Sequence, residues 1–310
     1  MQYELLPRTL SSDFRFHRLP DRAESAEFFN EVGPKVRGVV SPSDGDLRLD
    51  GGFLAKLPNL EIVAFVGAGY ENIDMKVAMA RGLTVTNTAG ANAVDVAEHA
   101  MALILDVARR ISEADRYVRT GKWVANGRMA GFSHRVTGRK LGILGLGNIG
   151  LAIAKCAAGF AMPVSYCNRK PRPDLPYRYV STVLELARDA DILVCATPGG
   201  PETHHMIDRA VLDALGRNGI LVNVGRGSIV DEDALVDALT DRRLGGAGLD
   251  VFENEPHVPE RLMTLPNVVL QPHHGGATQQ AVPAIFDLVA ANLRAYFLGG
   301  KIPTPVYRPG

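Results

Sequence analysis

The feature that most constrains the fold is a series of short apolar runs that alternate with helix-length segments through the second half of the chain. The runs are nearly continuous, without a polar residue at every second position, which is typical of parallel strands covered on both faces. They lie at residues 141–144, 163–167, 192–196, 220–224, 247–251 and 268–271. This pattern predicts an α/β fold with a doubly wound parallel sheet.

The first half of the chain carries a shorter series of the same kind. Strands are expected there at residues 36–40, 62–66 and 83–86, with connecting helices at 53–57 and 73–80. A second doubly wound parallel sheet follows from this series, and a length of 310 residues agrees with two domains.

Two longer amphipathic helices are predicted over residues 93–112 and 281–298, each at the point where one series gives way to the other. We expect these two helices to cross between a discontinuous outer domain and an inserted domain. The outer domain is predicted to comprise residues 1–95 and 279–310, and the inserted domain residues 96–278.

Residues 119–139 form a polar, glycine-containing stretch without the periodicity of a core element. This stretch contains Trp123, the only tryptophan of the chain. We expect it to form an arm that lies over a surface or over a partner subunit.

Charge and composition exclude several classes of protein. The 34 basic residues equal the 34 acidic ones and form no long run, so the electrostatic footprint of a nucleic-acid binder is missing. No apolar run reaches the roughly 18 residues of a membrane span, and residues 1–20 lack the apolar core of a signal peptide. Cys156, Cys167 and Cys195 are scattered without metal-ligand spacing. We therefore expect a soluble cytoplasmic protein with no nucleic acid, membrane or metal ion among its partners.

A glycine motif, Gly145-Leu-Gly147-Asn148-Ile149-Gly150, follows an expected strand and opens an expected helix. The first glycine of such a motif makes the tight turn, the second lets the backbone approach a pyrophosphate, and the third allows close helix–strand packing. The N-terminus of the helix offers N–H groups to the phosphates. The motif therefore predicts a Rossmann-like domain that binds a dinucleotide.

The end of the next strand indicates which dinucleotide is bound. NAD-specific sites carry an acidic residue about 20 positions beyond the glycines, which binds the ribose 2′-hydroxyl. This chain has Asn168-Arg169-Lys170-Pro-Arg172 instead, and an arginine can pair with a 2′-phosphate. We expect NADPH as the cofactor, with weaker use of NADH. A solvated basic turn is the alternative reading.

Ionisable residues also follow three later strands. Arg226 follows the fourth run of the second half, Asp250, Glu253 and Glu255 the fifth, and His273 the sixth. Each has an ordinary explanation alone, as a turn or loop residue. Together, at the sheet edge that faces the ligand, they supply a cation for a keto acid, a proton donor and an anion that keeps the donor protonated. That set suits the reduction of a carbonyl.

These motifs resemble those of the D-isomer-specific 2-hydroxyacid dehydrogenase family. The shared stretches run in the family's order from about residue 60 to residue 280. They are Val66–Asp74, Ala97–His99, Gly145–Gly150, Asn223–Gly227, Asp250–Pro256 and Pro272–Gly275. Within the family, the chain is most similar to the glyoxylate/hydroxypyruvate reductases.

The resemblance implies roles for the residues of these motifs. His273 would be the general acid that protonates the ketone oxygen, and Glu255 its paired carboxylate. Arg226 would bind the carbonyl and carboxylate oxygens of the substrate. The backbone N–H groups of Ala68 and Gly69, in a flavodoxin-like substrate-binding domain, would hold the substrate carboxylate.

The cofactor site implied by the resemblance combines the glycine motif, the basic turn and residues at later strand ends, where Asp250 would face the nicotinamide amide. Its expected residues are Gly145, Gly147, Asn148, Ile149, Gly150, Asn168, Arg169, Lys170, Arg172, Thr197, Pro198, Val224, Asp250 and Gly275. The chain departs from the family in having His274 after the catalytic histidine, where an aliphatic residue is usual. His204 and His205 are expected to be solvated loop residues.

We therefore expect an NADPH-dependent homodimer that reduces a short 2-keto acid, of the glyoxylate/hydroxypyruvate type, to the D-2-hydroxy acid. The loop at residues 41–45, the turn at 67–70 and Trp123 would select the keto acid. Two alternatives remain open. One is a non-enzymatic NAD(P)-sensing binding module on the same fold, and the other is a D-2-hydroxyacid dehydrogenase for a bulkier keto acid such as phenylpyruvate.

Overall fold

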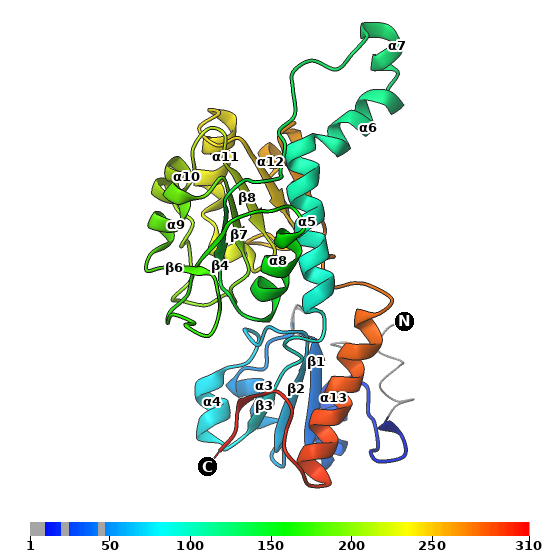
Figure 1. Cartoon of the computed structure of the whole chain (residues 1–310). Coiled ribbons are helices and arrows are strands. Elements are labelled where there is room, and N and C mark those ends of the chain that lie inside the picture. The colour runs from blue at the N-terminus through cyan, green and yellow to red at the C-terminus, as the bar shows by residue number, and fades with distance from the viewer. Residues whose placement is uncertain (1–9, 20–24, 43–46, 310) are drawn as a thin grey trace. The chain divides into compact units, whose positions relative to one another are not determined.

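The structure is a computed structural model that describes residues 10–19, 25–42 and 47–309. Residues 43–45 of the predicted selectivity loop lie outside the described residues. The chain divides into two compact units, one comprising Met1–Asn92 with Ala277–Gly310 and the other Ala93–Gly276. Both units are α/β with largely parallel sheets, as the apolar runs predict (Figure 1).

The unit at residues 93–276 is built on a seven-stranded sheet in the order β10-β9-β8-β7-β4-β5-β6, with every neighbouring pair parallel. Its strands are β4 (Leu141–Leu144), β5 (Val164–Cys167), β6 (Arg178–Val180), β7 (Ile192–Cys195), β8 (Ile220–Asn223), β9 (Gly246–Leu249) and β10 (Val268–Leu270). The order reverses between β4 and β7, and ligands of doubly wound folds bind at the carboxyl ends of strands beside such a switch point.

Helices cover both faces of this sheet (Figure 1). Alternate strand residues point to opposite faces: Ile192 and Val194 pack under α5 (Ala93–Arg109) and α8 (Asn148–Ala158), whereas Leu193 joins the core of the opposite face. The helices of that opposite face are α9 (Val183–Asp189), α10 (Arg209–Leu215), α11 (Glu232–Thr240) and α12 (Glu260–Thr264). Burial on both sides is why the strands read as continuous apolar runs.

In the other unit, the described strands form a sheet in the order β1-β2-β3-β11. They are β1 (Gly38–Pro42), β2 (Ile62–Val66), β3 (Thr84–Thr86) and β11 (Pro305–Tyr307). The first three strands are parallel, but β11 pairs antiparallel with β3, so this sheet is not parallel throughout. The C-terminal strand has three residues and begins with a proline, which suits only an edge position and gives no apolar run.

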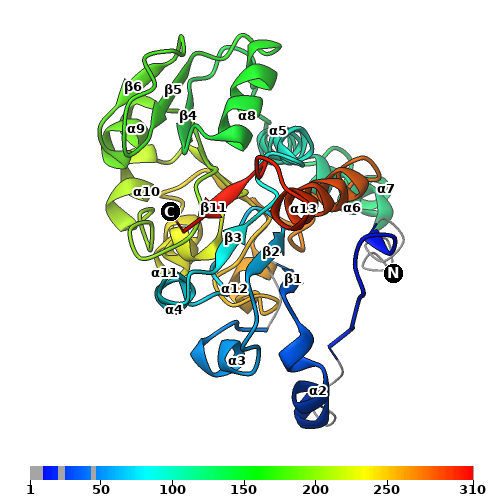
Figure 2. The same cartoon turned by 90° about the horizontal axis from the view of Figure 1, so that it is seen from below.

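Helices also lie on both faces of the smaller sheet (Figure 2). Ile62 and Ala64 pack against α13 (Ala281–Phe297), and Val63 and Phe65 belong to the core of the opposite face. The other helices in the described part of this unit are α2 (Ser25–Glu31), η3 (Gly33–Lys35), α3 (Gly51–Ala55) and α4 (Met75–Ala80). The flavodoxin-like topology of the unit stays a prediction.

The helix predicted over residues 93–112 ends early, at Arg109. Arg110 has a left-handed backbone, φ 57°, which breaks the helix, and α6 (Ile111–Arg119) and α7 (Lys122–Asn126) follow. These two helices project from the end of α5 (Figure 1). Trp123 and Phe132 of this arm are 59% and 98% exposed. None of the described helices is both long and apolar enough to span a bilayer.

Candidate active site

The glycine motif forms a turn between β4 and α8 in which two of the three glycines are sterically required. Gly145 has φ 96°, and a Cβ on Gly150 would lie 2.1 Å from the carbonyl oxygen of Gly145. In contrast, a Cβ on Gly147 would meet nothing within 4 Å. Gly147 is also the N-cap of α8, so no side chain covers the first N–H groups of that helix. This open backbone surface at a helix N-terminus fits the pyrophosphate of a dinucleotide.

The basic turn after β5 lies beside this motif. The side-chain oxygen of Asn168 accepts a hydrogen bond from Leu146 N–H at 2.7 Å, which ties the turn to the glycine motif. Arg172 is held by Asp174 through two hydrogen bonds of 3.0 and 2.8 Å. Arg169 is 90% exposed and lies 3.5 Å from Glu202, an exposed pair that is weak in water. Arg169 can therefore exchange this partner for a ligand phosphate at little cost.

Thr197, Pro198 and Val224, which are also predicted to bind the cofactor, lie at the carboxyl ends of β7 and β8, next to the glycine motif. A Cβ on Gly145 would lie 2.8 Å from Thr197 N, so the chain after β7 packs against the motif. Thr203 donates a hydrogen bond from its hydroxyl to Pro198 O at 2.9 Å, and Val224 N–H bonds Cys195 O at 3.1 Å. These loops therefore meet at the switch point of the sheet.

A histidine–carboxylate pair lies at the same edge of the sheet. His273, which follows β10, donates from Nδ1 to Glu255 Oε2 at 2.7 Å. The second carboxylate oxygen of Glu255 accepts Phe252 N–H at 2.9 Å. The hydrogen bond to Glu255 raises the pKa of His273 above its ordinary value, against the opposing effects of burial and of the Arg226 charge. With Nδ1 occupied, Nε2 is the nitrogen left to donate a proton.

The same contact acts on the carboxylate. Burial alone would raise the pKa of Glu255, but the hydrogen bonds from His273 and Phe252 N–H outweigh it and lower that pKa below its ordinary value. The contact therefore favours the charged forms of both partners, a carboxylate on Glu255 and an imidazolium on His273. His273 has φ 53°, a strained conformation for a histidine, and its N–H bonds Asp250 O at 2.8 Å.

Arg226 follows β8, the strand next to β9, and its loop is built by a buried asparagine. Asn223 donates from its side-chain amide to Arg226 O at 2.9 Å and accepts Gly225 N–H at 3.1 Å. The positive charge of Arg226 lowers the pKa of both His273 and Glu255, which places the guanidinium near the pair. Asn223 opens the motif that contains Arg226, but its role in positioning the arginine is not evident from the sequence.

The Asp250 carboxylate contacts three other residues of the site. Its side-chain oxygens accept His274 N–H at 2.7 Å and Gly275 N–H at 2.9 Å, and Oδ1 lies 3.3 Å from His99 Nε2. Burial opposes ionisation, but these contacts lower the pKa of Asp250. The carboxylate thus holds the backbone beyond His273. His99, on α5, belongs to the shared motif at Ala97–His99 but was not predicted as a site residue.

Glu255 and His273 also line a cavity of about 310 Å³. The rest of its wall is largely apolar and comprises Phe252, Pro256, Val258, Met263, Leu270, Gln271 and Pro272.

Ala68 and Gly69, predicted to bind the substrate carboxylate, belong to the other compact unit, in the turn after β2. Asn87 stabilises that turn by donating its amide N–H to Ala68 O at 2.7 Å.

Comparison with known proteins identifies the family of the chain. Residues 101–275 match the family described as D-isomer specific 2-hydroxyacid dehydrogenase, NAD binding domain. The chain is 46% identical over 301 residues to glyoxylate/hydroxypyruvate reductase A of Arabidopsis thaliana, and the match covers 97% of this chain and 95% of the relative. It is 44% identical over 303 residues to hydroxyphenylpyruvate reductase of Plectranthus scutellarioides, with the same coverage.

A solved structure shows the same likeness in three dimensions. The NADPH-dependent glyoxylate/hydroxypyruvate reductase of Sinorhizobium meliloti, in complex with NADP and malonate, superposes with a TM-score of 0.88 at 38% identity. The match covers 98% of this chain and 95% of that one. Motifs, sheet order and relatives along almost the whole chain lead to one conclusion: the protein belongs to the D-isomer specific 2-hydroxyacid dehydrogenase family.

Proposed function

We propose that this protein reduces a short 2-keto acid, of the glyoxylate/hydroxypyruvate type, to the D-2-hydroxy acid with NADPH. The observation that carries the proposal is the 2.7 Å hydrogen bond between His273 and Glu255, at the edge of the sheet that bears the glycine motif. A protonated imidazole can donate a proton to the ketone oxygen during reduction, and a neighbouring arginine stabilises the negative charge that develops on that oxygen. The names of the plant and bacterial relatives support the same substrate class.

In the proposed mechanism, Arg226 binds the carbonyl and carboxylate oxygens of the keto acid. A bound nicotinamide would supply hydride to the ketone carbon. His273 donates the proton from Nε2 to the ketone oxygen while Glu255 holds Nδ1. The negative charge of Glu255 stabilises the imidazolium before transfer and orients the ring, so that the proton donor is in place without reorganisation.

We also propose that the cofactor preference is set at Arg169. The end of β5 lacks the carboxylate that would repel a 2′-phosphate, and Arg169 is exposed with only Glu202 as an ion-pair partner in the described contacts. Lys170 and Arg172 add positive charge to the same turn. NADH would bind more weakly because its 2′-hydroxyl cannot use this charge.

We propose a second role for Asp250 besides facing the nicotinamide amide. Its contacts with His99, His274 and Gly275 make it a residue that positions the loop of the general acid, and any bond to the nicotinamide amide would be made in addition. Gly275 and Val224 are proposed to contact the cofactor through their backbone.

The protein is further proposed to act as a cytoplasmic homodimer. The arm that comprises α6, α7 and the following loop to Phe132 exposes Trp123, Val124 and Phe132, and large apolar side chains gathered on one projecting segment suit coverage by a second copy of the chain. Analytical ultracentrifugation tests this point: the sedimentation coefficient is expected to be that of a dimer of 33.4 kDa chains.

A bulkier keto acid is the second candidate substrate. It is favoured by the largely apolar cavity beside His273 and by the likeness to hydroxyphenylpyruvate reductase. Loss of reduced-nicotinamide absorbance, followed with glyoxylate, hydroxypyruvate, pyruvate and phenylpyruvate, distinguishes the candidates. The highest kcat/KM on glyoxylate or hydroxypyruvate supports the proposal, and the highest value on phenylpyruvate supports the second candidate. Cofactor binding without turnover on any keto acid would identify a non-enzymatic sensor.

A further inference from the structure

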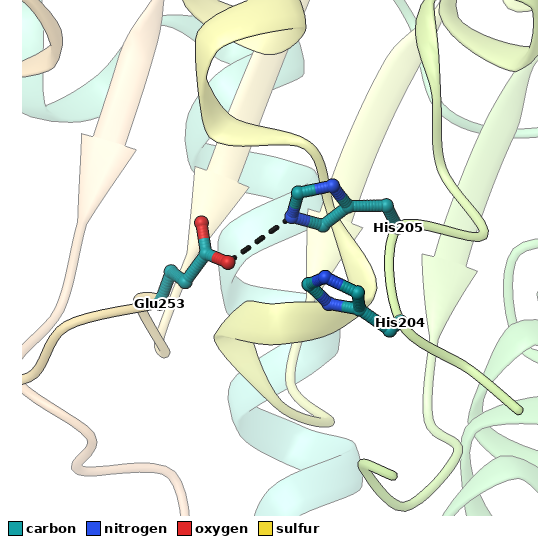
Figure 3. A group of neighbouring side chains, drawn as sticks. All are labelled: His204, His205 and Glu253. Atoms are coloured by element: carbon teal, nitrogen blue, oxygen red, sulfur yellow. Dashed lines mark hydrogen bonds and ion pairs between the residues drawn. The ribbon is translucent and has the colours of Figure 1, made fainter. Parts of the chain in front are cut away.

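Two histidines and a glutamate form a group that the proposed reaction does not use (Figure 3). His204 and His205 lie in the loop after β7, and Glu253 lies in the segment after β9. The histidines are separated from the glutamate by about 48 residues in sequence, so no spacing along the chain reveals the group, and the sequence predicted no metal site.

The potential metal-binding atoms of the three side chains converge. One nitrogen of each ring and one carboxylate oxygen all lie within 4.8 Å of one another, and His205 Nε2 is 3.1 Å from Glu253 Oε1. The two imidazole rings lie face to face, with centroids 3.9 Å apart and planes tilted by 33° (Figure 3). Tetrahedral ligands about 2.0–2.2 Å from a shared ion lie roughly 3.3–3.6 Å apart, so the widest separation in the group must shorten by about 1.2–1.5 Å.

A backbone carbonyl prepares one of the rings for this role. His204 Nδ1 lies 3.2 Å from Ser228 O, and donation of its N–H there leaves the lone pair on Nε2 for a metal ion. A hydrogen bond from the second ring nitrogen to a carbonyl is the usual outer support of a histidine ligand. The same Ser228 O accepts His205 N–H at 2.9 Å, so one carbonyl anchors both histidines.

The surroundings of Glu253 are rich in negative charge. Its backbone N–H donates to Glu232 Oε1 at 2.8 Å, so a second carboxylate lies against the segment that carries Glu253 and Glu255. A cation between Glu253 and the histidines would offset part of the repulsion between these carboxylates. His204 and Glu253 are exposed, which leaves space for water as a further ligand.

We propose that His204, His205 and Glu253 bind a divalent zinc ion. Two neutral imidazoles and one carboxylate, with an open position for water, form a donor set that suits Zn²⁺ and not the oxygen-preferring Mg²⁺ or Ca²⁺. The ion would cross-link the loop after β7 to the segment that carries Glu255. This inference does not depend on the proposed reduction. The alternative explanation of the contact between His205 and Glu253 is an ordinary exposed ion pair.

The test is zinc binding by the tag-free, full-length protein after treatment with a chelator, measured by competition with a chromophoric zinc indicator. No cofactor or turnover is needed. The wild type is expected to bind one Zn²⁺ per chain at micromolar concentrations. His204→Gln and Glu253→Gln are each expected to weaken binding at least tenfold, whereas His134→Gln, at an exposed histidine outside the group, is expected to bind as the wild type does.

Circular dichroism of each variant shows whether it is folded, and a shift of Tm with added zinc gives a second readout. Zinc is expected to raise the Tm of the wild type and of His134→Gln, and to leave that of Glu253→Gln unchanged, because only a folded site gains binding energy. Failure of the wild type to bind zinc at micromolar concentrations, or equal zinc affinity in all four proteins, would overturn the inference.

Discussion

Glu255 Oε2 lies 2.7 Å from His273 Nδ1, although the two residues belong to segments that follow different strands. Because β9 and β10 are neighbours in a parallel sheet, their carboxyl ends deliver both residues to the same edge. The carboxylate raises the pKa of the histidine, and the histidine lowers that of the carboxylate. The activity of the enzyme near neutral pH is therefore expected to depend on this one contact.

Glu255→Gln tests that dependence. The hydrogen bond to Glu255 raises the pKa of His273, so the acid form persists to higher pH in the wild type than an isolated histidine would allow. Without the carboxylate the pKa falls, and the descending limb of kcat/KM for reduction is expected to move to lower pH. The measurement is a pH–rate profile of both proteins, with the exposed-carboxylate variant Glu260→Gln as control. An unmoved descending limb in Glu255→Gln would show that another group controls it.

Arg226→Lys tests the substrate-binding role of the arginine. A lysine keeps the charge but cannot reproduce the planar fork that binds two oxygens, so kcat/KM is expected to fall by roughly 10²–10³-fold, the usual cost of one lost oxyanion donor. Cofactor Kd, measured by fluorescence, is expected to stay the same. Arg188→Lys, at an exposed helix position, serves as control. A change in cofactor Kd with kcat/KM preserved would instead assign Arg226 to the cofactor.

The glycine motif offers a matched pair of variants. Gly147→Ala places its methyl group in open space, so the protein is expected to fold with an unchanged Tm but to lose cofactor affinity by at least tenfold, because the methyl group occupies the approach of the pyrophosphate. Gly150→Ala brings its methyl group to 2.1 Å from Gly145 O and is expected to lower Tm. Thermal melts and cofactor titrations check both. Normal cofactor affinity in Gly147→Ala would place the dinucleotide elsewhere.

Arg169 and Glu202 are expected to set the cofactor preference in opposite directions. Arg169→Ala removes a charged partner of the 2′-phosphate and is expected to reduce the NADPH-to-NADH ratio of kcat/KM roughly tenfold, a modest effect because the site is exposed. Glu202→Gln removes the competing carboxylate and is expected to raise that ratio. Both effects weaken with ionic strength. A wild type that prefers NADH would show that this turn does not face the ribose.

Much of the larger sheet could be predicted from the sequence because its strands are buried on both faces. The run at 192–196, for example, gives β7 with one residue fewer, since Ile192 and Val194 pack on one face and Leu193 on the other. Strand β6 was missed because it is a three-residue strand at the edge of the sheet, with an exposed arginine at its first position. Strand β11 was missed because it is also a three-residue edge strand, and it begins with a proline.

The site was less predictable than the fold, because its side chains act through contacts that spacing does not show. The motifs located His273, Glu255 and Arg226 at one edge, but not the supporting bonds made by Asn223 or the contact between His99 and Asp250. The break of the long helix at Arg110 depends on a left-handed backbone that an arginine rarely adopts. No pattern of apolar residues predicts such a position.

The most direct test of the proposed reaction is the kcat of His273→Ala with hydroxypyruvate and NADPH. Loss of the general acid is expected to lower kcat by roughly 10²–10⁴-fold, while cofactor Kd stays within about twofold of the wild type because His273 acts on the substrate. His274→Ala, which removes only the neighbouring imidazole, is expected to keep most of the activity. A near-normal kcat in His273→Ala, with the loss appearing in His274→Ala instead, would contradict the assignment of His273 as the proton donor.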